Sequence, residues 1–350
     1  MLALHGPDAA VTDLHSRPAP QPLQPLIEVR DLRRHFPVEG GALGGAKRAV
    51  KAVDGVDFDV WKGETLGLVG ESGCGKTTLG RNVVRLDNPT AGSIKFEGVD
   101  ISGLDDRAMR PYRREIQIVF QNPFSSLNPR LTAGAMLMEP LKLHGTHSRR
   151  ERAGRAMELL EMVGLNADHF SRYPHEFSGG QRQRLGIARA LALDPKLIVC
   201  DEPVSALDVS VQSQILNLLR DLQERLGCSY LFISHDLSVI QHMSDRVAVM
   251  YLGRIVETAR VSDIYRRPMH PYTRALFSAV PVPDPDAQRN EIILEGSVPS
   301  PIDPPPGCHF STRCPYATEA CSASTPALEE HMPGHWVRCL RLHEIGWDHP

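Results

Sequence analysis

The stretch "GESGCGKT", from Gly70 to Thr77, decides how the rest of this sequence is interpreted. It fits the pattern G-x-x-x-x-G-K-[ST], in which successive backbone N–H groups surround a triphosphate. Glycine permits the turns that this requires, and the N-terminus of a following helix adds a positive potential. The Lys76 ammonium suits the β- and γ-phosphates, and the Thr77 hydroxyl suits Mg²⁺. The stretch therefore predicts a loop that binds a nucleoside triphosphate with Mg²⁺.

The residues on either side of this phosphate loop fit the same interpretation. "TLGLVG", Thr65–Gly70, is a short apolar run that ends in glycine, as buried parallel strands do. A helix is expected to begin at Lys76. This order of strand, loop and helix opens an α/β nucleotide-binding core and argues against a chance glycine-rich turn. The predicted nucleotide contacts are Gly70, Glu71, Ser72, Gly73, Cys74, Gly75, Lys76, Thr77 and Thr78.

A second motif, "LIVCDEP" from Leu197 to Pro203, supplies carboxylates. Four apolar residues predict a buried strand, and ligands bind where such strands end. Asp201 suits coordination of Mg²⁺, and Glu202 can polarise the water that attacks the γ-phosphate. Taken alone, the pattern is also typical of an acidic strand end that meets a helix. Beside the phosphate loop, it favours the catalytic interpretation.

A third motif, "FSGGQRQRLGIARAL" from Phe177 to Leu191, predicts a second helix start that could bind an anion. Ser178 is a good N-cap, and Gly179 and Gly180 let a backbone approach a ligand closely. One nucleotide does not need two such sites. We therefore expect two chains to meet head to tail, each presenting this turn to its partner's nucleotide. The simpler alternative is an ordinary helix cap.

These motifs, in this order, resemble those of the ATP-binding-cassette (ABC) ATPases. "SGGQ", Ser178–Gln181, is close to the signature of that family. The resemblance implies that ATP is the nucleotide and that Ser178, Gly179, Gly180 and Gln181 act on the nucleotide of the other chain. It also implies that the loop "SALD", ending at Asp208, crosses the dimer interface.

Three more positions take their expected roles from the same resemblance. Gln121 in "IVFQNP" matches the glutamine that senses Mg²⁺ and water and contacts the transporter. His235 in "LFISHDLSV" matches the switch histidine that contacts the γ-phosphate. Phe36 matches an aromatic that stacks on adenine, although it could equally be a core residue. The predicted catalytic residues are Glu202, His235 and Gln121, and the predicted Mg²⁺ ligands are Thr77, Gln121 and Asp201.

The later part of the chain narrows the resemblance. Residues 266–285, "RRPMHPYTRALFSAVPVPDP", and the later "PSPIDPPPGCHF" and "RCPYATEAC" look like the C-terminal region of dipeptide and oligopeptide importer ATPases. "NPFSSLNPR" after Gln121 is also typical of that group. The resemblance implies an ATPase subunit that powers peptide uptake at the cytoplasmic face of the cell membrane. Its partners would be a second ATPase subunit, as a heterodimer or homodimer, two integral membrane permease subunits and, indirectly, a peptide-binding protein.

The expected fold class is α/β: a P-loop ABC-ATPase core with a mixed sheet and flanking helices, an inserted helical subdomain and a small Cys-rich C-terminal extension. We expect an N-terminal arm over 1–24, the ATPase domain over 25–260 with its helical subdomain at about 122–180, and the extension over 261–350. The finer pattern predicts strands at Leu26–Phe36, Leu197–Cys200 and Ser229–Ser234, helices at Gln181–Leu193 and Val209–Leu226, a strand–turn–strand at Val50–Glu64 and a hairpin about Leu252-Gly253.

Composition excludes several other classes. The chain has 350 residues, 41% of them hydrophobic, and a net charge of −3, so no large basic face for nucleic acid is expected. No apolar run is long enough to span a bilayer. The first twenty residues do not read as a signal peptide, so we expect a cytosolic protein in which clustered cysteines favour metal over disulfides. The proline-rich runs at 280–286 and 298–307 exclude helix and central strand.

The cysteines fall into two groups. Cys74, Cys200 and Cys228 are expected to be small core or loop residues. Those of the tail, Cys308, Cys314, Cys321 and Cys339, are spaced x₅, x₆ and x₁₇, which matches neither zinc ribbons nor common ferredoxins. Spacing alone leaves zinc, [4Fe–4S] or no metal open; the resemblance to peptide importers implies [4Fe–4S]. His309 and His335 are possible substitute ligands, but histidines in such a tail are usually solvated.

Other functions remain as alternatives at this stage. Soluble ABC ATPases of DNA repair or translation usually carry coiled coils or tandem cassettes, and this sequence has neither. A metal-binding regulator that holds ATP only as a ligand would not need Glu202 and His235. An importer of another solute, such as nickel or a sugar, is the remaining alternative.

Overall fold

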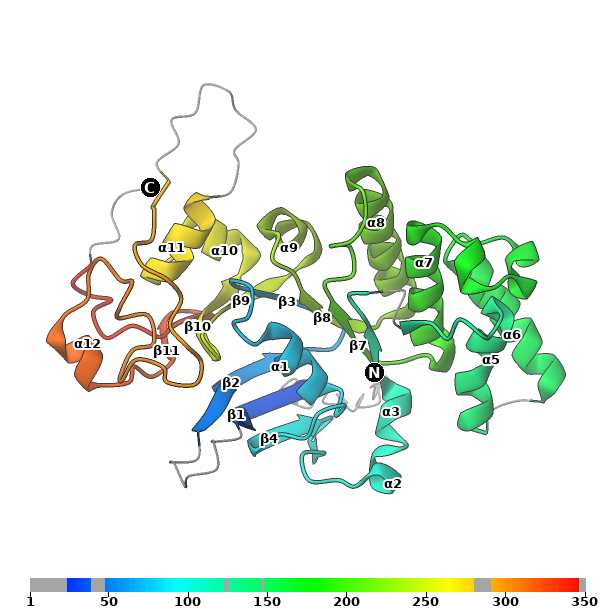
Figure 1. Cartoon of the computed structure of the whole chain (residues 1–350), viewed down its shortest axis with the longest axis horizontal. Helices are drawn as coiled ribbons and strands as arrows, with labels where there is room; N and C mark the ends of the chain where they lie inside the picture. Colours follow the sequence, from blue (N-terminus) through cyan, green and yellow to red (C-terminus); the bar gives the residue numbers. More distant parts are fainter. Residues whose placement is uncertain (1–23, 39–47, 123–125, 146–147, 280–290, 346–350) are drawn as a thin grey trace, which may run out of the picture.

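The structure, a computed structural model, describes residues 24–38, 48–122, 126–145, 148–279 and 291–345. Within these ranges the strands form two sheets (Figure 1). The smaller sheet is antiparallel and has the order β2 (Arg48–Val60), β1 (Ile27–Val38), β4 (Ala91–Phe96), β5 (Val99–Asp100). The larger sheet has the order β11 (Glu329–Met332), β12 (His335–Val337), β10 (Arg254–Arg260), β9 (Arg246–Tyr251), β3 (Thr65–Val69), β8 (Ser229–Ile233), β7 (Leu197–Asp201), β6 (Ile116–Val119).

The centre of the larger sheet is parallel from β9 to β6, and its far edge is antiparallel. Strands β3, β7 and β8 are buried on both faces, which explains why their sequences are nearly continuous apolar runs. Alternate residues point into two hydrophobic cores, one on each side of the sheet. The mixed sheet that the sequence predicts is therefore confirmed.

Helices cover both faces of this sheet. In Figure 1, α8 to α11 lie above it, and α1 with the smaller sheet lies below it. An inserted group, α5, α6 and the short 3-10 turns η1 and η2, forms one end of the molecule. The helices are α1 (Lys76–Val83), α2 (Asp106–Met109), α3 (Tyr112–Glu115), α5 (Ala133–Leu143), α6 (Arg149–Met162), α7 (Gly179–Ala190), α8 (Val209–Leu226), α9 (Leu237–Met243), α10 (Val261–Arg266), α11 (Pro271–Ser278) and α12 (Glu319–Ala323); the 3-10 turns are η1 (Ala167–Ser171), η2 (Pro174–Glu176) and η3 (Leu191–Leu193).

Several local predictions agree with these bounds. Helices α1 and α8 begin where the sequence places them, and β9 and β10 form the hairpin about Leu252-Gly253. Both turn residues have positive φ, 42° and 79°, as a tight two-residue hairpin requires. Helix α7 starts two residues earlier than predicted, at Gly179, and its last turn, Leu191–Leu193, is a 3-10 turn.

The strand–turn–strand predicted for Val50–Glu64 is wrong. The structure has one strand there, β2, and the Asp-Gly pair at Gly55 makes no hairpin turn. Gly55 has φ 80°, and Asp31 on the facing strand β1 has φ 44°. The register between the two strands shifts on both sides of Leu32, between Val29 and Leu32 and again between Leu32 and Arg33. The glycine therefore serves a bulge in a continuous strand pair instead of a chain reversal.

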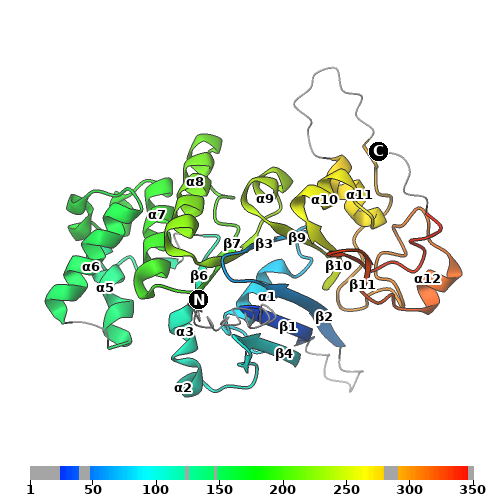
Figure 2. The same ribbon diagram turned by 180° about the vertical axis from the view of Figure 1, so that it is seen from behind.

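The C-terminal part of the chain contributes to the larger sheet. Strand β12 pairs antiparallel with β10, and β11 covers β12. Figure 2 shows α12 and β11 beside β10, at the end opposite α5 and α6. Helices α10 and α11 lie where the sequence pattern weakens after Val261 and were not predicted. The described proline-rich run 298–307 contains neither helix nor strand, as expected.

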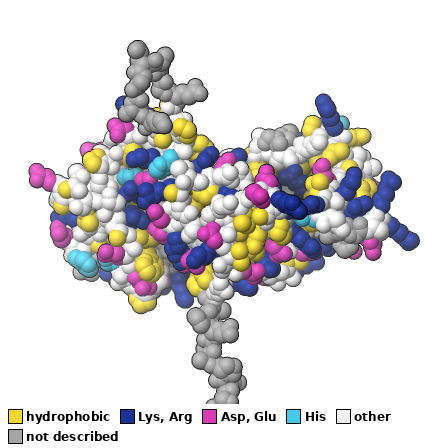
Figure 3. Space-filling model, turned by 90° about the horizontal axis from the view of Figure 1, so that it is seen from below, with side chains coloured by type: hydrophobic (Ala, Val, Ile, Leu, Met, Phe, Trp, Pro, Cys, Tyr) yellow, Lys and Arg dark blue, Asp and Glu magenta, His cyan; other side chains and the backbone are white. Residues whose placement is uncertain are grey.

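Charged side chains of both signs are interspersed on the face shown in Figure 3, and several Lys and Arg side chains project at the end that carries the inserted helices. Of the helices that the structure describes, none is both long and apolar enough to cross a bilayer. The predicted N-terminal arm and the run 280–286 lie outside the described residues, except for Gln24.

Candidate nucleotide site

A cavity of about 460 Å³ opens at the carboxyl ends of the central parallel strands. This volume is typical of sites for small organic ligands. Four neighbouring strands deliver its functional residues: β3 leads into the phosphate loop, β8 to His235, β7 to Glu202 and β6 to Gln121. The walls are Val50, Lys51, Ala52, Ser72, Gly73, Cys74, Gly75, Lys76, Thr77, Thr78, Gln121, Glu202, His235, Leu252, Gly253 and Pro301.

The phosphate loop needs its glycines for reasons of space and of backbone angle. Gly75 has φ 108°, and a Cβ there would lie 2.0 Å from the carbonyl oxygen of Ala52. A Cβ on Gly70, at φ 152°, would lie 2.1 Å from the carbonyl oxygen of Met250. Any side chain at either position would push the loop away from β2 or β9. The loop is therefore held close against two strands, and its residues from Ser72 to Thr78 line the cavity.

Lys76 is folded back onto the loop that carries it. Its Nζ donates to the carbonyl oxygens of Gly70, at 2.7 Å, and Glu71, at 3.1 Å. The side chain is almost fully buried, so its charge depends on these acceptors. An ammonium in this position can turn to a phosphate oxygen while keeping part of its carbonyl contacts.

Asp201, at the end of β7, accepts a hydrogen bond from the Thr77 hydroxyl at 3.0 Å. Only 4% of its surface is exposed. Burial raises the pKa of this carboxyl, and the Thr77 hydrogen bond opposes the rise only in part. A buried carboxylate beside a hydroxyl is a donor set that suits Mg²⁺, whose charge would offset the cost of burial.

Asp201→Asn should make the nucleotide-free protein more stable. A carboxyl with a raised folded-state pKa costs stability as the pH rises through that pKa, and asparagine removes the cost while still accepting from Thr77. We expect the free energy of unfolding to rise by about 0.5–2 kcal/mol at pH 7 in EDTA, as measured by urea unfolding. The gain should vanish below about pH 4, where the aspartate is protonated in both states.

The matched control for this prediction is Asp221→Asn, which neutralises an exposed carboxylate on α8 and should change stability little. An Asp201→Asn protein that unfolds at lower urea concentration than the wild type would show that the carboxylate is stabilised in the fold, against its assignment as a cation ligand.

Glu202, Gln121 and His235 form a polar cluster at the mouth of the cavity. The Gln121 side-chain amide donates to one Glu202 carboxylate oxygen at 2.8 Å, and His235 Nδ1 lies 3.3 Å from the other. Glu202 has φ 46°, which is unusual for a residue with a side chain, and its N–H donates to Ile233 on the adjacent strand. This strained backbone turns the carboxylate out of β7 toward the cavity.

The remaining predicted nucleotide contacts, which include Gly70 and Glu71 at the start of the loop, do not line the cavity. Ser178 caps α7 and forms a reciprocal capping box with Gln181, as its sequence indicates. Gly180 is explained by packing, because a Cβ there would lie 2.5 Å from Val211 on α8. Asp208 is the N-cap of α8. The residues Ser178, Gly179, Gly180, Gln181 and Asp208 do not line the cavity of this single chain.

Phe36 is also absent from the described walls of the cavity. It lies on β1 opposite Val50, which is one of the walls, and the Arg34 guanidinium lies 4.3 Å from the centre of its ring. The prediction that Phe36 stacks on adenine stays a prediction. Sequence reasoning missed the walls formed by Val50, Lys51, Ala52, Leu252, Gly253 and Pro301, since no motif marks them.

The tail cysteines converge although they are far apart in sequence. Cys308, Cys314, Cys321 and Cys339 all line one small cavity, and all are free thiols. Burial raises the pKa of Cys314 and of Cys339 to about 11. The donor set suits a soft metal, but the cavity measures only about 20 Å³, room for one water-sized sphere. Over the described part of the chain, no group of three or more His, Cys, Asp or Glu could hold a metal ion, so the predicted [4Fe–4S] cluster is not supported.

The expectation that His309 and His335 are solvated is wrong. His335 Nε2 lies 2.6 Å from the buried Glu257 carboxylate, and His309 Nδ1 donates to the carbonyl oxygen of Leu252 at 2.9 Å. Both histidines are more than nine-tenths buried. Their positions join the C-terminal segment to strand β10 and to the hairpin before it.

The chain is similar to known ATP-binding proteins of ABC transporters. Residues 53–205 match the family model described as ABC transporter, and residues 256–321 match the oligopeptide/dipeptide transporter C-terminal region. A Brucella ovis protein named as a peptide import ATP-binding protein is 56% identical over 317 residues, 91% of this chain and 98% of that protein. The oligopeptide transport ATP-binding protein AppF of Bacillus subtilis is 53% identical over 317 residues, 90% of this chain and 96% of that protein.

A solved structure shows the same core. The dimeric ATP-binding cassette MJ0796, in a post-hydrolysis state bound to ADP and Pi, has a TM-score of 0.60 and 31% sequence identity. The match covers 67% of this chain and 98% of that one. With its phosphate loop, its ordered motifs and these relatives, the chain belongs to the ABC transporter ATP-binding proteins, in the group that carries the oligopeptide/dipeptide transporter C-terminal region.

Proposed function

We propose that this chain is the ATP-hydrolysing subunit of an ABC importer that takes up di- and oligopeptides across the cytoplasmic membrane. The observation that carries the proposal is the single cavity into which the phosphate loop, Gln121, Glu202 and His235 converge from four neighbouring strands. The C-terminal match and the names of the relatives support peptide import over a soluble ATPase of DNA repair or translation.

The motif residues at the cavity, together with Asp201 beside Thr77, have proposed parts in hydrolysis. The loop N–H groups and Lys76 bind the phosphates, and Thr77, Asp201 and Gln121 hold Mg²⁺. Glu202 accepts a proton from the attacking water. The contacts of its carboxylate to Gln121 and His235 would hold that carboxylate in position. His235 is placed to contact the γ-phosphate. Release of that phosphate would remove its contact to His235 and loosen this cluster.

The site is proposed to be completed by a second ATPase chain. Ser178 and Gly179 begin helix α7, where a capping box pairs the N–H groups of Ser178 and Gln181, and they lie outside the cavity of their own chain. A partner turned head to tail would bring its own Ser178–Gln181 onto this cavity and exclude water from the phosphates. The partner is either a similar subunit or a second copy. Asp208, at the start of α8, would lie at the junction.

The proposed location is the cytoplasmic face of the membrane, with two permease subunits as partners. Co-expression with those subunits, purification and reconstitution into vesicles would test this directly. We expect ATP-driven uptake of labelled di- or oligopeptides that stops without ATP. Uptake of nickel or a sugar in place of peptides would show that the proposed substrate class is wrong. Failure to co-purify with any membrane subunit would contradict the importer assignment.

We propose, separately, that the four-cysteine cavity binds a soft metal when its thiols draw closer together, because as they lie among the described residues they form no group that could hold an ion. Its support is that four thiols from distant positions share one small space, which is large enough for a single ion. Anaerobic purification followed by iron, sulfide and zinc analysis tests it, with a Cys308→Ser/Cys314→Ser variant as the control. About one zinc per chain, lost in the variant, is the expected result. Iron with matching sulfide would indicate an expanded cluster site, and a metal-free sample would overturn the proposal.

A further inference from the structure

Glu71, the second residue of the phosphate loop, is held by three separate groups. Its backbone N–H donates to the Tyr272 hydroxyl at 2.9 Å. Arg313 Nη1 lies 3.1 and 2.9 Å from its two carboxylate oxygens. Its carbonyl oxygen accepts from Lys76 at 3.1 Å. Two of these three contacts come from the C-terminal segment, which here means residues 261–345.

Both contacts rest on buried and well-connected side chains. The Tyr272 side chain is fully buried, and its ring centre lies 4.7 Å from that of Tyr251 and 5.5 Å from that of Phe310. The side chain of Arg313 is only 9% exposed. Neither group can move far without disturbing the packing around it.

A buried carboxylate, Glu257 on β10, fixes the start of the helix that carries Tyr272. It accepts from the N–H groups of Met269 and His270, at 2.7 and 2.8 Å, and contacts His335 on β12 at 2.6 Å. This arrangement places α11 so that the Tyr272 hydroxyl reaches the loop. The sequence "HPYT" suggests no catalytic role by itself. Its structural role is to place Tyr272 against the phosphate loop.

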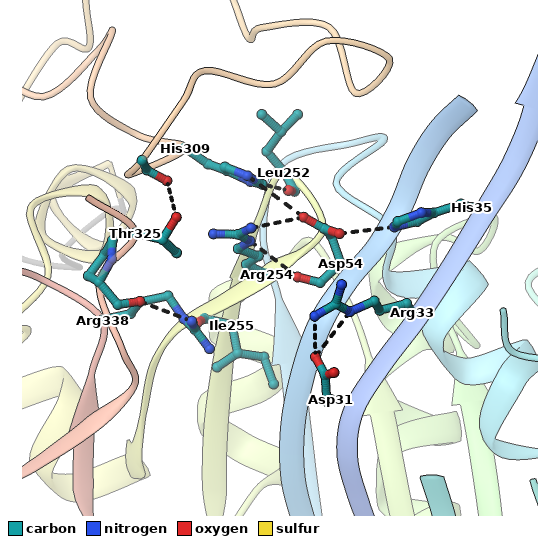
Figure 4. A network of polar contacts seen from close by, with 12 residues as sticks. Asp31, Arg33, His35, Asp54, Leu252, Arg254, Ile255, His309, Thr325 and Arg338 are labelled. Carbon is teal, nitrogen blue, oxygen red and sulfur yellow. Dashed lines mark hydrogen bonds and ion pairs between the residues drawn. The ribbon is translucent and has the colours of Figure 1, made fainter. Parts of the chain in front are cut away.

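A second connection reaches the other wall of the cavity. Pro301 lines the cavity, and its carbonyl oxygen accepts from the Lys51 N–H at 2.9 Å. Figure 4 shows His309 reaching Leu252 and Asp54, and Asp54 in turn contacting Arg254 and His35. Burial opposes ionisation of Asp54, but Arg254 and His35 outweigh it and lower its pKa. The C-terminal segment therefore borders the nucleotide cavity on two sides.

We propose that Tyr272 and Arg313 are positioning residues that clamp the phosphate loop in the shape that binds ATP. This rests on the proposed function. Tyr272 fixes the peptide whose carbonyl holds Lys76, and Arg313 neutralises a carboxylate one residue before Ser72, a wall of the cavity. Without Arg313, the Glu71 charge would repel the phosphates.

The test measures ATP affinity and ATPase kinetics on the full chain and on its complex with the membrane subunits. For Arg313→Gln we expect Kd and KM for ATP to rise about 5- to 20-fold, with kcat within about 2-fold, because the lost contact acts on binding. Tyr272→Phe, which keeps the ring and removes the hydroxyl, should raise Kd and KM for ATP about 3- to 10-fold. The Arg313→Gln penalty should grow from AMP to ADP to ATP and shrink in high salt.

The double variant Glu71→Gln/Arg313→Gln distinguishes a loss of ATP affinity caused by the unpaired Glu71 charge from one caused by a disturbed fold. It removes the repelling charge together with its partner, so ATP affinity should return to within about 3-fold of wild type. A merely structural role for the ion pair would leave the double variant as weak as the single one, which would overturn the proposal. Arg220→Gln, which breaks an exposed pair on α8, and Tyr265→Phe, which removes a partly buried hydroxyl contact to Leu237, are matched controls.

The outcomes also distinguish this proposal from the proposed function. If the wild-type chain binds ATP and Lys76→Ala does not, while Arg313→Gln and Tyr272→Phe bind like wild type, the clamp is wrong and the ATPase assignment stands. If the wild-type chain does not bind ATP, the proposed function itself fails.

Discussion

Glu202→Gln is expected to give a protein that binds ATP but hydrolyses it about 10²- to 10⁴-fold more slowly. Glutamine keeps the size of the side chain and can still accept a hydrogen bond from Gln121, but it cannot take a proton from water. The phosphate loop is untouched, so Kd for ATP should stay within a few-fold of wild type. Steady-state ATPase activity of the complex and equilibrium ATP binding measure the two quantities.

The control for Glu202→Gln is Glu224→Gln, which makes the same change at an exposed site on α8 and should leave both quantities unchanged. Because a proposed two-chain site closes around ATP, the Glu202→Gln protein should also accumulate as a nucleotide-bound dimer, visible by size-exclusion chromatography. Wild-type turnover in the variant would remove Glu202 as the catalytic carboxylate and would leave His235 to be tested.

Lys76→Ala is expected to lose ATP affinity by about 100-fold or more. The ammonium is nine-tenths buried at the cavity wall, and charge-assisted contacts to phosphates are strong in such a place. Alanine also leaves the carbonyl oxygens of Gly70 and Glu71 without this donor. Equilibrium titration with ATP measures the loss.

Lys76→Met is the companion variant, because it keeps the apolar stem and removes only the charge and its donors. It should bind as poorly as Lys76→Ala, with a folded protein by circular dichroism. Lys62→Ala, at an exposed lysine that pairs with Glu97, is the surface control. ATP affinity close to wild type in both Lys76 variants would contradict the phosphate-loop assignment.

The central site could be predicted because its geometry follows from local rules. A parallel sheet brings the carboxyl ends of its strands to one edge, so motifs that end such strands must meet there. Ser72 after β3, Glu202 after β7 and His235 after β8 illustrate this. Gly70 and Gly75 carry the same information, because their positive φ values and crowded surroundings admit no other residue.

The sequence could not predict the contacts that join the ends of the chain. Tyr272 reaches Glu71 across 201 residues, through a hydrogen bond with no periodic signal. The Asp-Gly pair at Gly55 shows a different limit, since the same φ serves a hairpin turn or a bulge and only the facing strand decides. The spacing of the four tail cysteines likewise gave no account of the small cavity that they share.

The distance in sequence between the clamping residues and the phosphate loop also determines when the loop becomes clamped during synthesis of the chain. Arg313 follows Glu71 by 242 residues. At about 5–20 residues per second, a ribosome needs on the order of tens of seconds to travel from one codon to the other. A nascent chain would thus expose every catalytic motif before its loop is clamped. Full affinity for ATP would arise only after Arg313 has been synthesised, so a product truncated before Arg313 would bind nucleotide more weakly than the clamped chain.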